Sequence, residues 1–117
     1  MELAQTITIP AAMLGDKWAG VYKIHILSAR EYLQVGESLV QQQRKNPNWN
    51  GQMDMNELRI NLVCKATLHN DKPVDPEMPS KLYEILSMIA LPLNTISVQE
   101  TEQLFLPSNK VNPPASG

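Results

Sequence analysis

The chain has 117 residues, of which 43% are apolar and 19% charged, with a formal net charge of −2 and a pI of about 5.6. This composition is typical of one folded domain and argues against an intrinsically disordered chain. The acidic balance and the absence of a Lys/Arg cluster argue against a nucleic-acid partner, because phosphate binding draws most of its affinity from grouped cations.

The first 27 residues have the pattern of a β-hairpin. Residues 3–9 are rich in β-branched side chains and end before Pro10, and residues 21–27 alternate polar and apolar side chains. We therefore expect two antiparallel strands within residues 3–27, with His25 on the surface beside Lys23. Because a lone hairpin is only marginally stable, it must pack on helices or gain strands from another chain.

Capping signals divide the rest of the chain into helices. Ser28 and Glu31 have capping-box spacing and predict a helix over residues 29–45. Its apolar positions share one face and are Tyr32, Leu33, Gly36, Leu39 and Val40. By the same spacing, Asp54 with Glu57 predicts a helix over residues 54–69. That helix is apolar on most sides, so it is either central or offers one face to a partner.

Two further helices follow. Pro79 and Ser80 begin a helix over residues 80–91, which we expect to end near Pro92, and Ser97 with Glu100 begins one over residues 98–106. The predicted fold class is α+β and mainly α-helical, with an N-terminal β-hairpin packed on a bundle of about four helices. One globular domain spans residues 1–107, and a flexible Pro-rich tail spans residues 108–117.

Charge is unevenly distributed along the chain. Residues 17–45 are mainly basic, with Lys17, Lys23, Arg30, Arg44 and Lys45 against Glu31 and Glu37. Residues 71–102 are mainly acidic, with Asp71, Asp75, Glu77, Glu84, Glu100 and Glu102 against Lys72 and Lys81. Such a layout orients subunits or partners, or it marks two solvated faces.

The residues that carry chemistry are few and scattered. His25 and His69 lack a second ligand at helical spacing, and His69 falls in the last turn of the helix predicted over residues 54–69. Cys64 is expected to be inert core packing, and no nucleophile-elbow or phosphate-loop motif occurs. We therefore predict no enzyme activity, no metal and no cofactor. Without a visible secretory signal or membrane-spanning run, a reducing cytoplasm is the expected location.

Four stretches carry a resemblance to a known family: "TITIPAAMLGDKWAG" at 6–20, "YKIHILSAREYL" at 22–33, "ELRINLVCKAT" at 57–67 and "SMIALPLNTISVQETEQLFL" at 87–106. Over roughly residues 5–106 the chain resembles the tail assembly chaperones of long-tailed bacteriophages and prophages, through its layout and the phrase "LSAREYL". The resemblance implies a non-enzymatic protein in the cytoplasm of a bacterial host. There it would bind the tape-measure protein during tail morphogenesis and help recruit tail-tube subunits. The family often makes a longer form by ribosomal frameshifting.

A chaperone of a helical client needs adaptable apolar surface, and methionine side chains supply it. Met53, Met55 and Met88 are the candidate partner-binding residues, and the alternative is that all three lie in the core. Two other functions stay open. One is a structural virion component, a head–tail connector or tail-completion protein, which forms an oligomeric ring. The other is a small cytoplasmic nucleic-acid-binding regulator. Homo-oligomerisation is compatible with each.

Overall fold

The computed structural model describes residues 1–105, and its elements define an α+β fold that is mainly helical, as predicted. In chain order they are β1 (Glu2–Ile9), α1 (Ala11–Leu14), a 3-10 turn (Asp16–Trp18), β2 (Gly20–Ile26), α2 (Ala29–Arg44), α3 (Met55–Ala66), β3 (Thr67–His69), β4 (Lys72–Pro73), α4 (Ser80–Asn94) and α5 (Val98–Phe105). Residues 106 and 107, where the predicted last helix and domain end, and the tail predicted over residues 108–117 lie outside the described residues.

The strands form one antiparallel sheet in the order β1-β2-β3-β4. The predicted hairpin is confirmed: β1 pairs with β2, with Ile7 opposite Tyr22 and Thr6 opposite Lys23. Side chains on one face of this hairpin, such as Tyr22 and Ile24, are fully buried, whereas Thr6, Thr8 and Lys23 on the other face are exposed. The hairpin therefore presents one face to the core and one to solvent, as antiparallel sheets commonly do.

Strands β3 and β4 were not predicted, and the prediction of helix over residues 67–69 is wrong. The helix ends at Ala66, because Thr67 adopts an extended conformation with φ −116° and ψ 126°. Residues 67–69 then pair with residues 22–24 of β2. A β-branched threonine suits this change, and strand pairing with a distant segment overrides the helical periodicity. Asn70 and Asp71, both with positive φ, make the turn into β4.

Helix α4 continues through Pro92 to Asn94, so its predicted end near residue 91 is wrong. A proline inside a helix removes the hydrogen bond to the carbonyl four residues earlier. Here that carbonyl belongs to Met88, which is 76% exposed, and Pro92 is exposed as well. The break therefore falls on the solvent side of α4.

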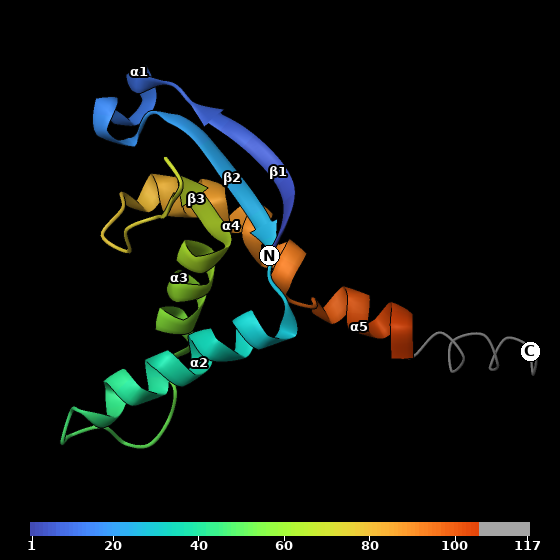
Figure 1. The fold of residues 1–117 in the computed structure, drawn as a ribbon. Coiled ribbons are helices and arrows are strands. Elements are labelled where there is room, and N and C mark those ends of the chain that lie inside the picture. The colour runs from blue at the N-terminus through green and yellow to red at the C-terminus, as the bar shows by residue number, and fades with distance from the viewer. Residues whose placement is uncertain (106–117) are drawn as a thin grey trace, which may run out of the picture.

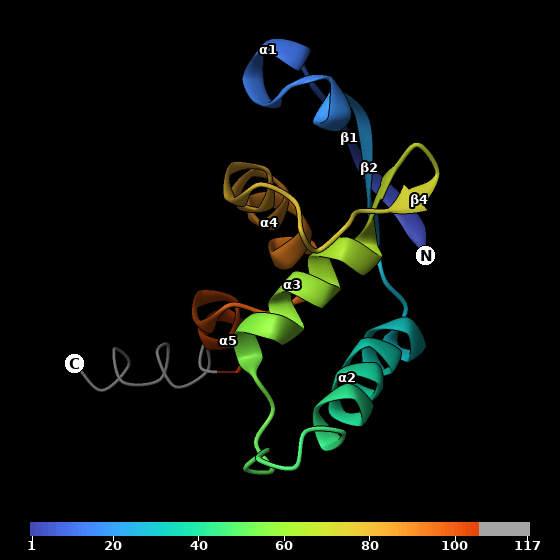
Figure 2. The same cartoon turned by 90° about the vertical axis from the view of Figure 1, so that its left-hand side faces the viewer.

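The core lies between the inner face of the sheet and the helices α3 and α4 (Figure 1). Tyr22 and Ile24 of β2, Val63 of α3, and Leu82 and Leu86 of α4 are each fully buried. Helix α2 packs beside α3 and extends past it, and α5 projects away from the sheet (Figure 2). The two ends of the helical region are therefore covered far less than the centre.

Asn94 ties the end of α4 to the exit of β2. Its side-chain oxygen accepts a hydrogen bond from the Leu27 backbone N–H at 2.7 Å. Its side-chain nitrogen donates to the backbone carbonyls of His25 and Ala90, each at 3.0 Å. This one side chain fixes where α2 leaves the sheet relative to α4, and it thereby positions the surface described next.

Candidate partner-binding surface

Helix α2 begins where the sequence places it. The Ser28 hydroxyl accepts from the Glu31 N–H at 3.1 Å, and the Glu31 carboxylate accepts from the Ser28 N–H at 2.9 Å. The hydrogen bond from the Ser28 backbone N–H to the Glu31 carboxylate is the main cause that holds the pKa of Glu31 below its usual value, with a smaller contribution from the Met1 amino group, 3.2 Å away. The predicted capping box is confirmed.

The predicted apolar face of α2 is buried only in part. Of the five predicted positions only Leu39 is buried, and Tyr32 and Leu33 are 37% and 62% exposed. Val35, which was not among the five, is buried beside Leu39. The reason is that α3 is the main helical neighbour of α2. It covers only the side of α2 that faces it. The rest of the apolar face is left at the surface.

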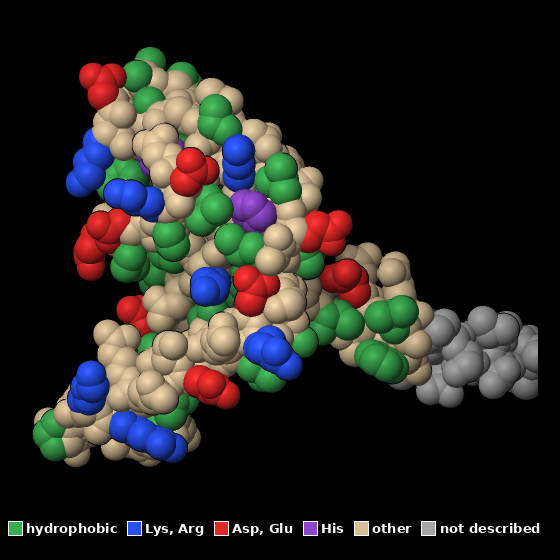
Figure 3. Space-filling model, in the orientation of Figure 1, with side chains coloured by type: hydrophobic (Ala, Val, Ile, Leu, Met, Phe, Trp, Pro, Cys, Tyr) green, Lys and Arg blue, Asp and Glu red, His purple; other side chains and the backbone are tan. Residues whose placement is uncertain are grey.

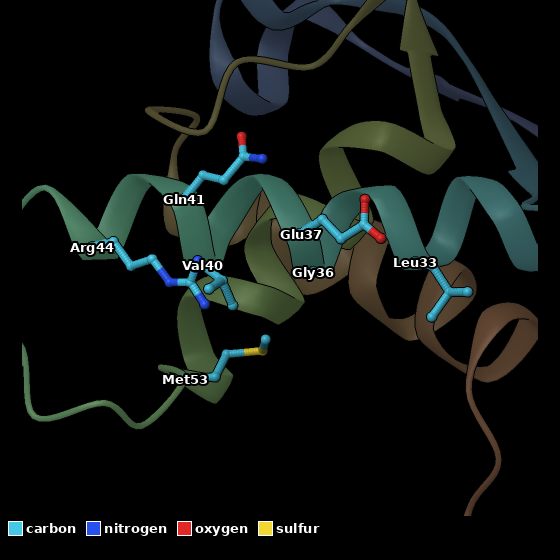
Figure 4. Close-up of a pocket in the computed structure, with 7 residues that line it drawn as sticks. All are labelled: Leu33, Gly36, Glu37, Val40, Gln41, Arg44 and Met53. Atoms are coloured by element: carbon cyan, nitrogen blue, oxygen red, sulfur yellow. The ribbon is translucent and has the colours of Figure 1, made fainter.

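This uncovered side forms a groove, here named the α2 groove. Its volume is about 400 Å³ and its lining residues are Leu33, Gly36, Glu37, Val40, Gln41, Arg44 and Met53. Figure 4 shows Val40 and Met53 close together below α2, with Leu33 further along the same helix. Leu33, Gly36 and Val40 are spaced by three and four residues, so they line one side of α2 over about 10 Å.

Gly36 gives the groove its depth. A Cβ atom at this position would lie 3.8 Å from the terminal methyl carbon of Met53, an ordinary van der Waals contact. The glycine therefore leaves space that a methyl group could fill without strain. A glycine inside a helix costs stability relative to alanine, so the open space is maintained at the expense of the helix.

The loop after α2 carries Met53 back to the groove. The Asn46 side chain accepts from the Asn48 N–H at 3.0 Å, and the Asn50 side chain accepts from the Gln52 N–H at 2.9 Å. The Trp49 indole N–H donates to the Gln52 carbonyl at 2.7 Å. Short polar side chains of this kind form local turns in place of helix. The loop is thus held by its own hydrogen bonds, and it ends at Asp54, which caps α3.

Charged residues border the groove. Glu37 and Arg44 are seven residues apart on α2, so the two charges of opposite sign flank its apolar floor. In the space-filling view, Lys and Arg side chains gather toward the far end of the arm that α2 and its loop form (Figure 3). The groove therefore has a direction: it is acidic near Glu37 and basic near Arg44.

A second, smaller depression lies where α3 and α4 meet the start of α2. Its volume is about 250 Å³, and Tyr32, Met55, Leu58, Arg59, Leu62, Leu91, Thr95 and Ile96 line it. Met55 is 52% exposed there, and Met88 lines neither depression although it is 76% exposed. The structure thus does not bring Met53, Met55 and Met88 together in one groove. Met53 was one of the three predicted partner-binding methionines, but its place beside Leu33, Gly36 and Val40 depends on the loop after α2 and was not predicted.

Both histidines have structural surroundings. His25 is 9% exposed, so its predicted place on the surface is wrong. Its Nδ1 lies 3.1 Å from the Ala66 carbonyl, and since a carbonyl can only accept, this nitrogen carries the hydrogen. His69 lies in β3 and not in a helix. It stacks on Tyr22 with ring centroids 4.2 Å apart, and its Nε2 donates to the Ala19 carbonyl.

Cys64 is buried in α3, as expected. Burial is the main cause that raises the pKa of its thiol to about 11, helped by the negative charges of Asp75 and Glu57. At neutral pH this thiol is almost entirely protonated, which is the unreactive form. Within residues 1–105, no three His, Cys, Asp or Glu side chains are grouped so that they could hold a metal ion. No helix in the same range is long and apolar enough to cross a membrane.

Comparison with known proteins gives no match: no family model, no curated protein and no solved structure matches the chain.

Proposed function

We propose that the protein is a non-enzymatic assembly chaperone that binds an amphipathic helix of a client in the α2 groove. The observation that carries the proposal is the groove itself, in which Leu33, Val40 and Met53 surround the space above Gly36. Soluble proteins seldom leave apolar side chains grouped at the surface without a partner. A groove along one helix is a common way to bind a second one.

The geometry of the groove describes the client segment that fits. Its apolar floor is about 10 Å long, which matches about two turns of a docked helix. Apolar side chains spaced three and four residues apart would enter between Leu33 and Val40. The charges at its border favour a basic residue next to Glu37 and an acidic residue next to Arg44. Methionine at position 53 suits a surface that adapts to more than one such segment.

The resemblance to phage tail assembly chaperones supplies the biological setting of this proposal. The client is then the tape-measure protein, a long and helix-rich chain, and the chaperone keeps it soluble while tail-tube subunits are recruited around it. A long chain of this kind offers many amphipathic helices, and covering them during assembly prevents their aggregation. The action needs no reacting group, only reversible burial of apolar surface.

The test is co-expression with the tape-measure protein named above as the client, which we expect to be a long, helix-rich protein encoded near this one. We expect the wild-type chain to keep that client in the soluble fraction and to copurify with it. Leu33→Asp places a charge in the groove, and because Leu33 is 62% exposed the fold should tolerate it. This variant should lose client solubilisation. Gln42→Asp adds the same charge to an exposed position of α2 outside the groove and should retain it.

Two outcomes would count against the proposal. One is a client that stays insoluble with the wild-type chain. The other is equal solubilisation by Leu33→Asp and Gln42→Asp when circular dichroism shows that both are folded. The first removes the chaperone function, and the second removes the α2 groove as its site.

A further inference from the structure

The outer edge of β1 is an open backbone edge. β1 is the first strand of the sheet and pairs with β2 on one side only. Leu3 is 52% exposed, and residues 2–6 and 8 are all exposed. In the ribbon view β1 forms the outer boundary of the hairpin, and no described helix packs extensively along it (Figure 1). Its unpaired N–H and C=O groups are therefore available to another strand.

The side chains of β1 lack the usual protection of such an edge. Natural sheets block edge pairing with lysines, prolines or very short strands. β1 is eight residues long, and between Leu3 and Ile9 it has neither a proline nor a charged residue. A register shift between Leu3 and Gln5 interrupts it near one end, which leaves residues 5–9 as a regular stretch. Two copies of this stretch can approach without repulsion between like charges.

The opposite edge of the sheet is closed to the same contact. β4 is two residues long, and one of the two is Pro73, which has no N–H to donate. A head-to-tail contact from β1 of one copy to β4 of the next is therefore disfavoured. What remains is the pairing of β1 with β1, which is symmetric and closes after two copies.

We propose that two copies of the chain associate through antiparallel pairing of their β1 strands, centred on Ile7, into one continuous eight-stranded sheet. Ile7 is the middle residue of the regular stretch, so residues 5–9 of one copy run opposite residues 9–5 of the other. This register places Thr6 opposite Thr8 of the second copy on the exposed face, and threonine pairs are favourable there. On the other face Ile7 lies opposite its own copy and loses its remaining exposure.

The inference does not depend on the chaperone function, because β1 and the α2 groove are separate surfaces. It does account for an outer strand that packs extensively on no described helix. Pairing with a second copy gives this strand a second neighbour.

Sedimentation velocity from about 1 μM to about 1 mM protein tests the proposal, and we expect a monomer–dimer equilibrium. The variant Thr6→Glu/Thr8→Glu places two pairs of like charges across the two-fold axis and should raise the dissociation constant about 10-fold. Within one copy the new residue at position 6 faces Lys23, so the fold should be retained. Mixing this variant with Thr8→Lys should restore a mixed dimer. Gln99→Glu/Gln103→Glu changes the same charge on exposed positions of α5 and should leave the constant unchanged.

A chain that stays monomeric at the highest concentration overturns the inference. So does a dimer whose dissociation constant is the same for the β1 variant and the α5 control, because the contact would then lie elsewhere. A closed ring in native mass spectrometry also overturns it, since a ring needs a head-to-tail contact. Because client solubilisation is not measured here, failure of this test leaves the proposed chaperone function to its own experiment.

Discussion

Helices α2 and α4 show how differently two helices of similar length can be used in one small protein. Helix α4 has Pro79 at its N-cap without a side-chain hydrogen bond, yet Leu82, Leu86 and Ala90 are almost completely buried. Helix α2 has a complete capping box, yet Leu33 is 62% exposed. The local signal that starts a helix is therefore independent of how much of it the core covers.

The difference has a functional meaning. Burial of large aliphatic side chains stabilises the fold by about 1.5–3 kcal/mol each, and α4 contributes in this way. Helix α2 stabilises the fold less in this way, because part of its apolar surface stays exposed. A partner can bury that exposed apolar area. Helix α4 is thus part of the core, and under the proposed function α2 is the helix that binds the client.

The largest expected effect separates the two helices directly. Leu86→Ala removes a side chain with no exposed area and should destabilise the protein by about 2–5 kcal/mol through lost burial and the cavity left behind. Leu33→Ala, the same substitution on α2, should change stability by about 0.5 kcal/mol or less. Urea unfolding followed by circular dichroism measures both. Equal losses for the two variants would mean that α2 is as buried as α4, contrary to the comparison.

The next largest effect concerns the link between the two regions. Asn94→Ala deletes the partner of the Leu27 N–H and of the His25 carbonyl and should cost about 1–3 kcal/mol. Asn94→Asp keeps the oxygen that accepts from the Leu27 N–H but loses the N–H donor. It should therefore also lower the free energy of unfolding, and at pH 7 the charged aspartate is repelled by the carbonyls of His25 and Ala90. Urea unfolding gives the losses, and hydrogen exchange at Leu27 separates the variants. That amide should exchange faster in the alanine variant and stay protected in the aspartate variant.

Asn94 and residues 67–69 show where sequence reasoning stops. Strands β1 and β2 and the starts of the four longer helices were predictable, because alternation and capping residues are local patterns. Two of the three hydrogen bonds of Asn94 depend on a helix end meeting the exit of β2, 67 and 69 residues away, and nothing near Asn94 in the chain marks that meeting. Likewise β3 forms because β2 offers an edge to residues 67–69, although these residues continue the helical periodicity of α3.

For the candidate site the same limit applies. Helical spacing placed Leu33, Gly36 and Val40 on one face of α2, and that much is confirmed by the groove they share. Whether this face was buried depended on how many helices lie against α2, which is a property of the whole fold. The one signal in the sequence for the groove is Gly36 itself, because a glycine at the centre of an apolar helix face indicates space or a close approach.

A smaller effect is expected at Gly36, where one substitution should raise stability and weaken client binding. Gly36→Ala should raise the free energy of unfolding by about 0.5–1 kcal/mol, because alanine favours the helix and the added methyl meets Met53 at an ordinary contact distance. The same methyl fills the groove floor, so client binding should weaken. Gln42→Ala, an exposed position of α2 outside the groove, is the control and should leave client binding unchanged. A variant that is more stable and binds the client as before would contradict the role of Gly36.

The smallest expected effect on stability concerns the capping box of α2, which is the clearest local signal in the sequence. Because the folded-state pKa of Glu31 is lowered, its charge stabilises the folded state above the unfolded value of about 4.5, and this contribution is lost as the pH falls through the lower folded value. Glu31→Gln keeps an oxygen to accept from the Ser28 N–H and removes only the charge. Its urea midpoint should lie below that of the wild type at pH 7 and coincide with it in acid, below both pKa values.

Glu100 forms a capping box with Ser97 at the start of α5, and it is the matched control for Glu31. It accepts from the Ser97 N–H at 3.0 Å, as Glu31 does from Ser28, but α5 buries no residue. Glu100→Gln should therefore leave the global urea midpoint unchanged at both pH values. If the urea midpoints of Glu31→Gln and the wild type differed by the same amount at both pH values, the charge of Glu31 would not be the cause of the difference. Equal midpoint shifts for both variants would show instead that α5 unfolds together with the core, and α5 would then belong with α4 and not with the exposed side of α2.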